Sequence, residues 1–187
     1  MASKTKTVNM GGLDLVVNRI RMGVKNRSEG DVAIADTVAE GVLAGRRQIT
    51  SITADDTKTL TANDSGTLFL LNKATGIVFT LPAPEVGLWF EFQVNTSVTS
   101  NAYKWSTATQ GTDFFNGNIF INDSDTAASL LACVGNGSTH DNISMNGTTT
   151  GGLAGTRIRI ECISSTVWTC SGINQGSGAV ATPFATT

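Results

Sequence analysis

Short segments in which apolar and polar residues alternate recur from about residue 50 onwards, and this period of two is the strongest constraint on the fold. In the clearest segment, residues 88–94, every second residue is apolar, and Trp89, Glu91 and Gln93 occupy the positions between them. Such alternation is typical of a strand with one buried face. The chain contains 20 Gly but only 3 Pro and is rich in Thr, a composition that favours short strands joined by polar turns over a helical bundle.

About ten strands are expected, and turns rich in Gly, Asn and Ser separate them. The segments 67–72 and 77–81 are expected to form one hairpin, and 156–163 and 167–171 another. No helical pattern of 10–15 residues lies between these strands. We therefore predict an all-β fold, an antiparallel β-sandwich or a jelly-roll-like barrel of short strands, preceded by an extended N-terminal arm. The expected strands are 57–61, 67–72, 77–81, 88–94, 103–107, 118–121, 127–134, 141–145, 156–163 and 167–171.

The last hairpin has a sequence that fixes its register. Apolar residues at 158, 160 and 162 alternate with charged residues at 157, 159 and 161. A three-residue loop at 164–166 would pair Cys162 with Trp168 and Ile160 with Cys170, which places Trp168 in the core. Cys162 and Cys170 then share a face without lying opposite each other. We expect these two cysteines and Cys133 to be free thiols.

The first 50 residues differ from the rest in charge and pattern. They carry eight basic and five acidic residues, a net charge of +3, whereas the remaining 137 residues carry a net charge of −5. The apolar positions between 13 and 24 fit a helix but also alternate as in a strand, and the segment is too short to fold alone. We predict an extended partner-binding arm with short ordered pieces at 1–50, a β-sandwich body at 51–173 and a flexible C-terminal tail at 174–187. The arm residues expected to bind the partner are Leu13, Val16, Val17, Arg19, Ile20, Arg21, Arg46 and Arg47.

Sequence motifs that would support catalysis or metal binding are missing. The single histidine, His140, lies in a polar loop with Ser138 and Asp141, which are too close in sequence for a catalytic triad. The nucleophile elbow, the zinc-protease motif and the P-loop are absent. Residues 122–125 resemble half of a calcium loop but lack its Gly and Glu, so we interpret them as a surface turn, with a weak cation site as the alternative. We expect no enzyme activity, no cofactor and no structural metal.

The aromatic side chains allow two interpretations. Trp89 shares its face with Glu91 and Gln93. We expect a neighbouring sheet or subunit to cover this polar face, and the alternative is a platform on which a ligand stacks.

Four segments, in this order along the chain, resemble motifs of tailed-bacteriophage virion proteins. They are TLTANDSGTLFLLN at 59–72, FTLPAP at 79–84, GLWFEFQV at 87–94 and VWTCSG at 167–172. Capsid decoration (cement) proteins, head fibres and tail-fibre modules use such a β-sandwich. The resemblance implies a homotrimer on the outside of the virion capsid, synthesised in the host cytoplasm and bound to the major capsid protein.

These observations favour a structural virion protein, a capsid decoration protein that binds the outer shell through its N-terminal arm and stabilises it. The alternative is a receptor- or glycan-binding fibre module in which Trp105 or Tyr103 contacts a sugar. An internal DNA-binding protein is disfavoured, because eight bases against five acids is a low ratio and the pI is about 5.3. We therefore expect no nucleic acid as partner, and because no window of 18 apolar residues is present, we expect no membrane as partner either.

Overall fold

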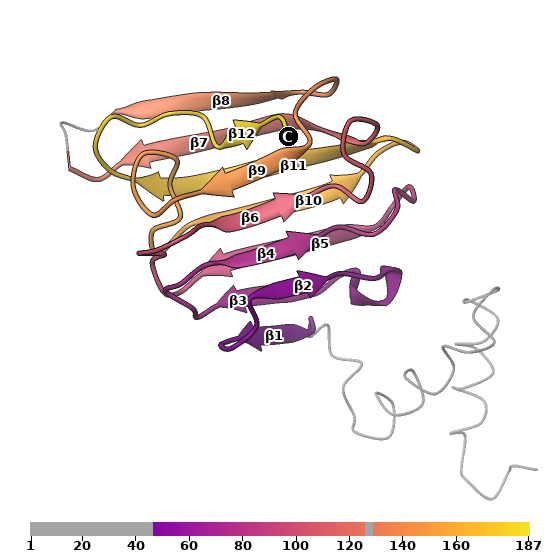
Figure 1. The fold of residues 1–187 in the computed structure, drawn as a ribbon, viewed down its shortest axis with the longest axis horizontal. Helices are drawn as coiled ribbons and strands as arrows, with labels where there is room; N and C mark the ends of the chain where they lie inside the picture. The colour runs from indigo at the N-terminus through magenta and orange to yellow at the C-terminus, as the bar shows by residue number, and fades with distance from the viewer. Residues whose placement is uncertain (1–46, 126–128) are drawn as a thin grey trace, which may run out of the picture. The chain divides into compact units, whose positions relative to one another are not determined.

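The computed structural model describes residues 47–125 and 129–187, which form a sandwich of two packed β-sheets (Figure 1). From edge to edge, the seven-stranded sheet contains β1 (Ile49–Ile52), β3 (Leu68–Leu71), β5 (Trp89–Val94), β10 (Arg157–Cys162), β11 (Val167–Gly176), β7 (Phe114–Asp123) and β8 (Leu130–Asn136). The five-stranded sheet contains β12 (Phe184–Ala185), β9 (Asn142–Met145), β6 (Tyr103–Ser106), β4 (Ile77–Thr80) and β2 (Thr57–Thr59). A 3-10 helix, Ala62–Asp64, follows β2. The predicted all-β sandwich is confirmed, but both sheets are mixed rather than antiparallel.

The first six strands alternate between the two sheets along the chain. As a result β1, β3 and β5 pair in parallel in one sheet, and β2, β4 and β6 pair in parallel in the other. They make three turns of a flattened coil (Figure 1). The predicted hairpin between 67–72 and 77–81 is therefore wrong, since β3 and β4 belong to different sheets. The connection passes through Gly76 at a φ of +78°, where a Cβ atom would lie 2.3 Å from the carbonyl oxygen of Ala102.

The second half of the sandwich is built around β10, β11 and β7. The predicted hairpin of β10 with β11 is confirmed, with Cys162 opposite Trp168 and Ile160 opposite Cys170. Trp168 is fully buried, and all three cysteines are free and buried, as expected. On its other side β11 pairs in parallel with β7 over ten residues, from Val167 opposite Phe114 onwards. This long parallel pair joins two segments that are more than 40 residues apart in the chain.

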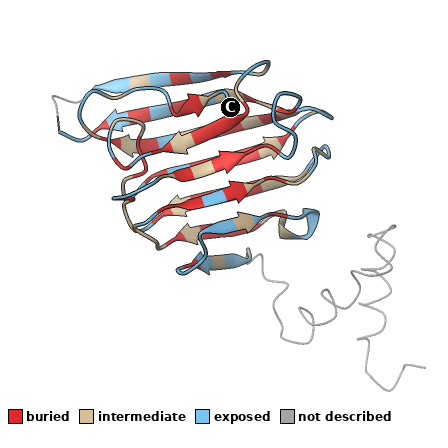
Figure 2. Ribbon diagram, viewed as in Figure 1, coloured by how far each residue is buried: buried red, intermediate tan, exposed pale blue. Residues whose placement is uncertain are grey.

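The hydrophobic core is built from buried residues on strands of both sheets, which Figure 2 marks along the ribbon. An aromatic cluster connects them: the ring centroids of Phe69 and Phe92 in one sheet lie 5.4 Å apart, and those of Phe79 and Trp105 in the other lie 5.8 Å apart. Across the core, the Phe92 and Trp105 centroids are 5.2 Å apart. These are distances at which aromatic rings attract one another, so the cluster fixes one sheet against the other.

The boundaries of the body differ from those that the sequence suggested. Strand β1 begins at Ile49, so the last residues of the expected arm belong to the seven-stranded sheet. The expectation of a flexible tail at 174–187 is wrong, because β11 continues to Gly176 and β12 pairs with β9 in the other sheet. Asn174 is fully buried and Phe184 lies in the core. Within the described ranges, no helix has the length and apolar character that crossing a membrane requires.

Candidate partner-binding face

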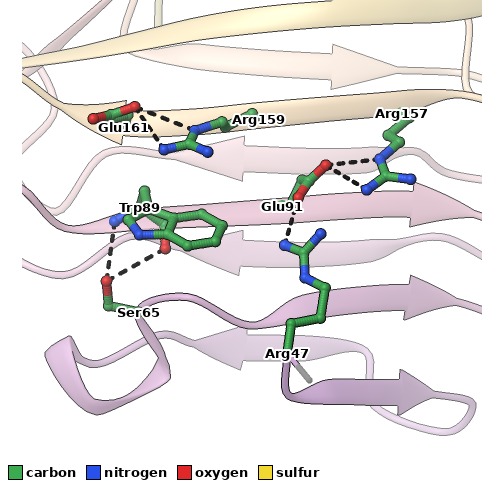
Figure 3. Close-up of polar contacts among 7 residues, drawn as sticks. All are labelled: Arg47, Ser65, Trp89, Glu91, Arg157, Arg159 and Glu161. Carbon is green, nitrogen blue, oxygen red and sulfur yellow. Dashed lines mark hydrogen bonds and ion pairs between the residues drawn. The ribbon is translucent and has the colours of Figure 1, made fainter. Parts of the chain in front are cut away.

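The seven-stranded sheet has an outer face, the side turned away from the five-stranded sheet, and its middle is charged. The period of two along β5 and β10 directs Trp89, Glu91 and Gln93 to this side, together with the charged residues of β10. The register brings Glu91 beside Arg159 and Gln93 beside Arg157. Two neighbouring strands therefore place a row of charged groups on one surface, which Figure 3 shows.

Glu91 joins two arginines from different parts of the chain. Its Oε1 accepts a hydrogen bond from Nε of Arg157 at 2.7 Å and forms an ion pair with Nη2 of the same residue at 2.7 Å, and its Oε2 forms an ion pair with Arg47 (Figure 3). Only 15% of the Glu91 side chain is exposed. Burial alone would raise the pKa of Glu91, but the hydrogen bonds and charges of Arg47 and Arg157 outweigh it and lower the pKa. Glu91 thus fixes Arg47, where the described chain begins, to β10 through the outer face.

Trp89 lies under two guanidinium groups of the same chain. The central carbon of Arg159 is 4.2 Å from the ring centroid and that of Arg47 is 5.5 Å from it. The backbone N–H of Trp89 donates to Oγ of Ser65 at 3.1 Å, and Arg159 also binds Glu161 at 2.9 Å. Trp89 remains partly exposed beside these two groups. The two guanidinium groups stand where a stacking ligand would lie.

A shallow depression of about 490 Å³ lies beside this charged row. Its lining includes Arg157, Arg159, Ser171, Gln93 and Gln175. The side chains of Arg157 and Arg159 are 50% and 43% exposed, so part of each guanidinium group remains open to a partner. Guanidinium, amide and hydroxyl groups in this arrangement can bind carboxylates and carbonyls of a protein surface.

The other half of the outer face, on β11, β7 and β8, carries exposed apolar side chains. Ile173 lies beside Phe120, and their exposed fractions are 55% and 40%. On β8, Leu130 and Val134 are 63% and 59% exposed. This patch was not predicted from the sequence. The available signal was the run 119–121 (Ile-Phe-Ile), where three consecutive apolar residues in a strand must place one of them on the outer face.

Most of the arm residues that were expected to bind the partner lie outside the described part of the chain. Of the expected arm residues, only Arg47 lies in the described part of the chain, and it is bound to Glu91 and Trp89 of the body. The remaining residues lie outside the described residues: Leu13, Val16, Val17, Arg19, Ile20, Arg21 and Arg46.

The residues proposed for sugar binding lie in the core. Tyr103 and Trp105 are both fully buried. The Tyr103 hydroxyl lies 2.7 Å from the carbonyl oxygen of Lys73 and 2.8 Å from that of Thr96. Their side chains anchor loops and fill the core, so the interpretation of either as a sugar contact is wrong.

The polar loops have structural partners. The ring of His140 stacks on Phe184, with 5.7 Å between centroids, and its Nδ1 accepts the N–H of Asn136 at 3.3 Å. The Oδ1 of Asp123 accepts the N–H of Asp125 at 3.3 Å, which is the geometry of a turn. Within 47–125 and 129–187, no group of three or more His, Cys, Asp or Glu side chains could hold a metal ion.

Comparison of the chain with family models and with curated proteins gives no match.

Proposed function

We propose that this protein is a structural component of a phage virion, a capsid decoration protein that binds the outer surface of the shell and stabilises it. The observation that carries the proposal is the attachment of Arg47 to the outer face through Glu91 and Trp89. The basic N-terminal segment joins the body at this point. Segment and charged face can therefore act on the same partner surface.

The chemistry of the charged row suits an acidic protein surface. Arg47 and Arg157 share the single carboxylate of Glu91, and Arg159 pairs with Glu161, so three guanidinium groups face two carboxylates. The half-exposed Arg157 and Arg159 can form further bidentate contacts with carboxylates of the major capsid protein. Such contacts favour rapid and specific docking, and they weaken as the salt concentration rises.

The N-terminal segment would extend the contact across the shell. The 46 residues before Arg47 would span at most about 160 Å when fully extended, which is enough to reach beyond one capsid subunit. Apolar residues such as Leu13, Val16 and Ile20 would be buried on docking, and Arg19 and Arg21 would pair with acids of the shell. Several copies that bind together would gain affinity, because each later contact is intramolecular. The proposal also follows the resemblance of the four sequence segments to phage virion proteins.

The test measures binding of the full-length protein to purified shells by co-sedimentation. Arg157→Gln with Arg159→Gln removes two charges from the outer face, and Leu13→Ser with Ile20→Ser removes apolar groups from the segment. Lys104→Gln is the matched control, because Lys104 lies on β6 of the other sheet. We expect each double variant to bind at least tenfold more weakly and the control to bind like the wild type.

A second measurement separates decoration from attachment to a host. Wild-type protein at saturation should raise the temperature at which shells release their DNA. Unchanged shell stability, or binding that neither double variant affects, would contradict the proposal. Loss of host adsorption when the protein is blocked, without any effect on shell stability, would favour a fibre module.

A further inference from the structure

Outward positions on three neighbouring strands carry no charge. On β11, β7 and β8 the outward residues are apolar or are uncharged Ser, Thr, Asn and Gln. On the adjacent β5 and β10, by contrast, four of the six outward residues are charged. The uncharged area is called the neutral half-face below. Its outward residues are Val167, Thr169, Ser171, Ile173, Gln175, Phe114, Asn116, Asn118, Phe120, Asn122, Leu130, Ala132, Val134 and Asn136.

Apolar side chains gather near the middle of the neutral half-face. The register places Ile173 of β11 beside Phe120 of β7, and Phe120 beside Ala132 of β8. Val134 and Leu130 flank this row on β8, opposite Asn118 and Asn122. A sheet face that meets only water usually carries polar residues at such positions. An apolar centre without charges, next to a charged margin, is instead the composition of a protein–protein interface.

We infer that the neutral half-face is the surface on which a second copy of this chain docks. The lack of charge on the neutral half-face favours a second copy over a strongly acidic or basic partner. The margin carries Arg157 and Arg159 together with Glu91 and Glu161. Because Arg157 is already paired with Glu91 and Arg159 with Glu161, the margin brings no unpaired charge of one sign against a second copy.

The size of the surface also fits self-association. Strands β7 and β11 are ten residues long, which corresponds to about 33 Å. With β10 as the margin, four strands span about 19 Å, so the area in projection is up to about 600 Å². Stable complexes bury about 600–1,000 Å² of accessible surface per partner. The accessible surface of this face is larger than its projected area, because the side chains protrude from the sheet. The inference does not depend on shell binding, and it supplies the multivalency that the proposed function uses.

The test measures the mass of the full-length protein in solution by sedimentation equilibrium, without shells. We expect the wild type to be an oligomer, with a mass that is at least twice the 19.5 kDa of one chain. Ile173→Asp and Val134→Asp each place a charge in the neutral half-face and should weaken association at least tenfold. Val86→Asp and Val78→Asp are matched controls, because both residues are exposed and lie outside this surface, Val78 on β4 of the other sheet. Both controls should associate like the wild type.

A further variant separates loss of association from loss of folding. Val134→Thr keeps the shape and strand preference of valine but removes apolar surface, so it should weaken association while circular dichroism stays unchanged. A wild type that is monomeric at 100 µM would overturn the inference, as would an oligomer that none of the three variants affects. Variants that keep the oligomer but lose shell binding would assign the surface to the shell instead. An oligomer that dissociates as expected but never binds shells would contradict only the proposed function.

Discussion

The guanidinium carbon of Arg159 lies 4.2 Å from the centroid of the Trp89 ring, and the same guanidinium group binds Glu161 at 2.9 Å. The side chain of Arg159 is thus held in place on the outer face by two contacts, one with Trp89 and one with Glu161. A cation over an indole ring at an exposed site contributes about 0.5–1 kcal/mol, and an exposed ion pair adds less than about 1 kcal/mol.

Replacing Arg159 should therefore reduce stability by a small but measurable amount. We expect Arg159→Ala to lower the free energy of unfolding by about 1 kcal/mol in urea denaturation. Arg159→Lys keeps the charge but loses the planar group that stacks on the ring, so it should fall between the alanine variant and the wild type. A lysine variant as stable as the wild type would show that the planar stacking does not contribute.

The pH dependence of stability should report the state of Glu91. Its pKa is lower in the folded protein than its ordinary value of 4.5, so the carboxylate stabilises the fold at neutral pH. This contribution should be complete above pH 4.5 and disappear as the pH falls through the folded-state pKa. Glu91→Gln should cost about 1–2 kcal/mol at pH 7, because Arg47 and Arg157 lose their shared counter-charge. The difference from the wild type should shrink towards pH 3, and a difference that grows on acidification would contradict this assignment.

Gly117 should be far more sensitive to substitution than Gly111. Both have a positive φ, +98° and +76°. Gly117 of β7 lies opposite Cys170 of β11, and a Cβ atom on Gly117 would lie 2.1 Å from the carbonyl oxygen of Cys170. A Cβ atom on Gly111 would have no other atom within 4 Å. We expect Gly111→Ala to cost about 1 kcal/mol through backbone strain alone and Gly117→Ala to cost clearly more, about 3 kcal/mol. Thermal unfolding of the two variants provides the comparison, and equal melting temperatures would refute the close approach.

Asn174 should be essential to the last long strand. It is fully buried, its Oδ1 accepts hydrogen bonds from the N–H of Gly152 and the hydroxyl of Thr156, and its Nδ2 donates to the Thr150 carbonyl. Asn174→Ala would leave these groups buried without partners, at a cost of about 2–4 kcal/mol. The exposed Asn118, on β7, is the control, and Asn118→Ala should change the unfolding free energy by less than about 0.5 kcal/mol. Similar losses for the two variants would rule out this role.

The three thiols should be unreactive until the protein unfolds. Cys133, Cys162 and Cys170 are free and buried, and burial raises the pKa of each. A raised pKa keeps the thiol protonated, and only the thiolate reacts rapidly. Titration with a disulfide reagent at pH 8 should detect no thiol in native protein and three per chain in denaturant. Fast reaction of one thiol in the native state would indicate local opening.

Sequence periodicity predicted the faces of the strands better than their neighbours. Alternation identified the buried sides of β5 and β10, and the three-residue loop after Ile163 set the register of the last hairpin. Alternation reports only which side of a strand is apolar, and a strand that crosses to the other sheet has the same pattern as one that turns back. For this reason β3 and β4 were expected to pair although they lie in different sheets.

The C-terminal region and the outer face show a second limit. Residues from Asn174 onwards are rich in Gly, Ser and Thr, so composition suggested a tail. Their order depends on long-range partners, such as the pairing of Phe184 with Ile143 and the hydrogen bonds around Asn174. The charged row could be predicted in part, because the outward sides of β5 and β10 follow from their alternation. The placement of Arg47 over it depends on the fold of the whole sheet.

The coil formed by β1 to β6 makes the length of this body adjustable. Equivalent residues on successive turns are separated by 19 to 26 positions, as in the pairs Ile49–Leu68 and Ile77–Tyr103. One more or one fewer turn would change the width of both sheets by about 4.8 Å and leave the hairpin half, with its own hydrogen bonds, intact. Among the described strands of the coil, β1 and β2 of the first turn are the edge strands. Duplication of a single short stretch of sequence can therefore move the attachment point of the N-terminal segment away from the neutral half-face in fixed steps.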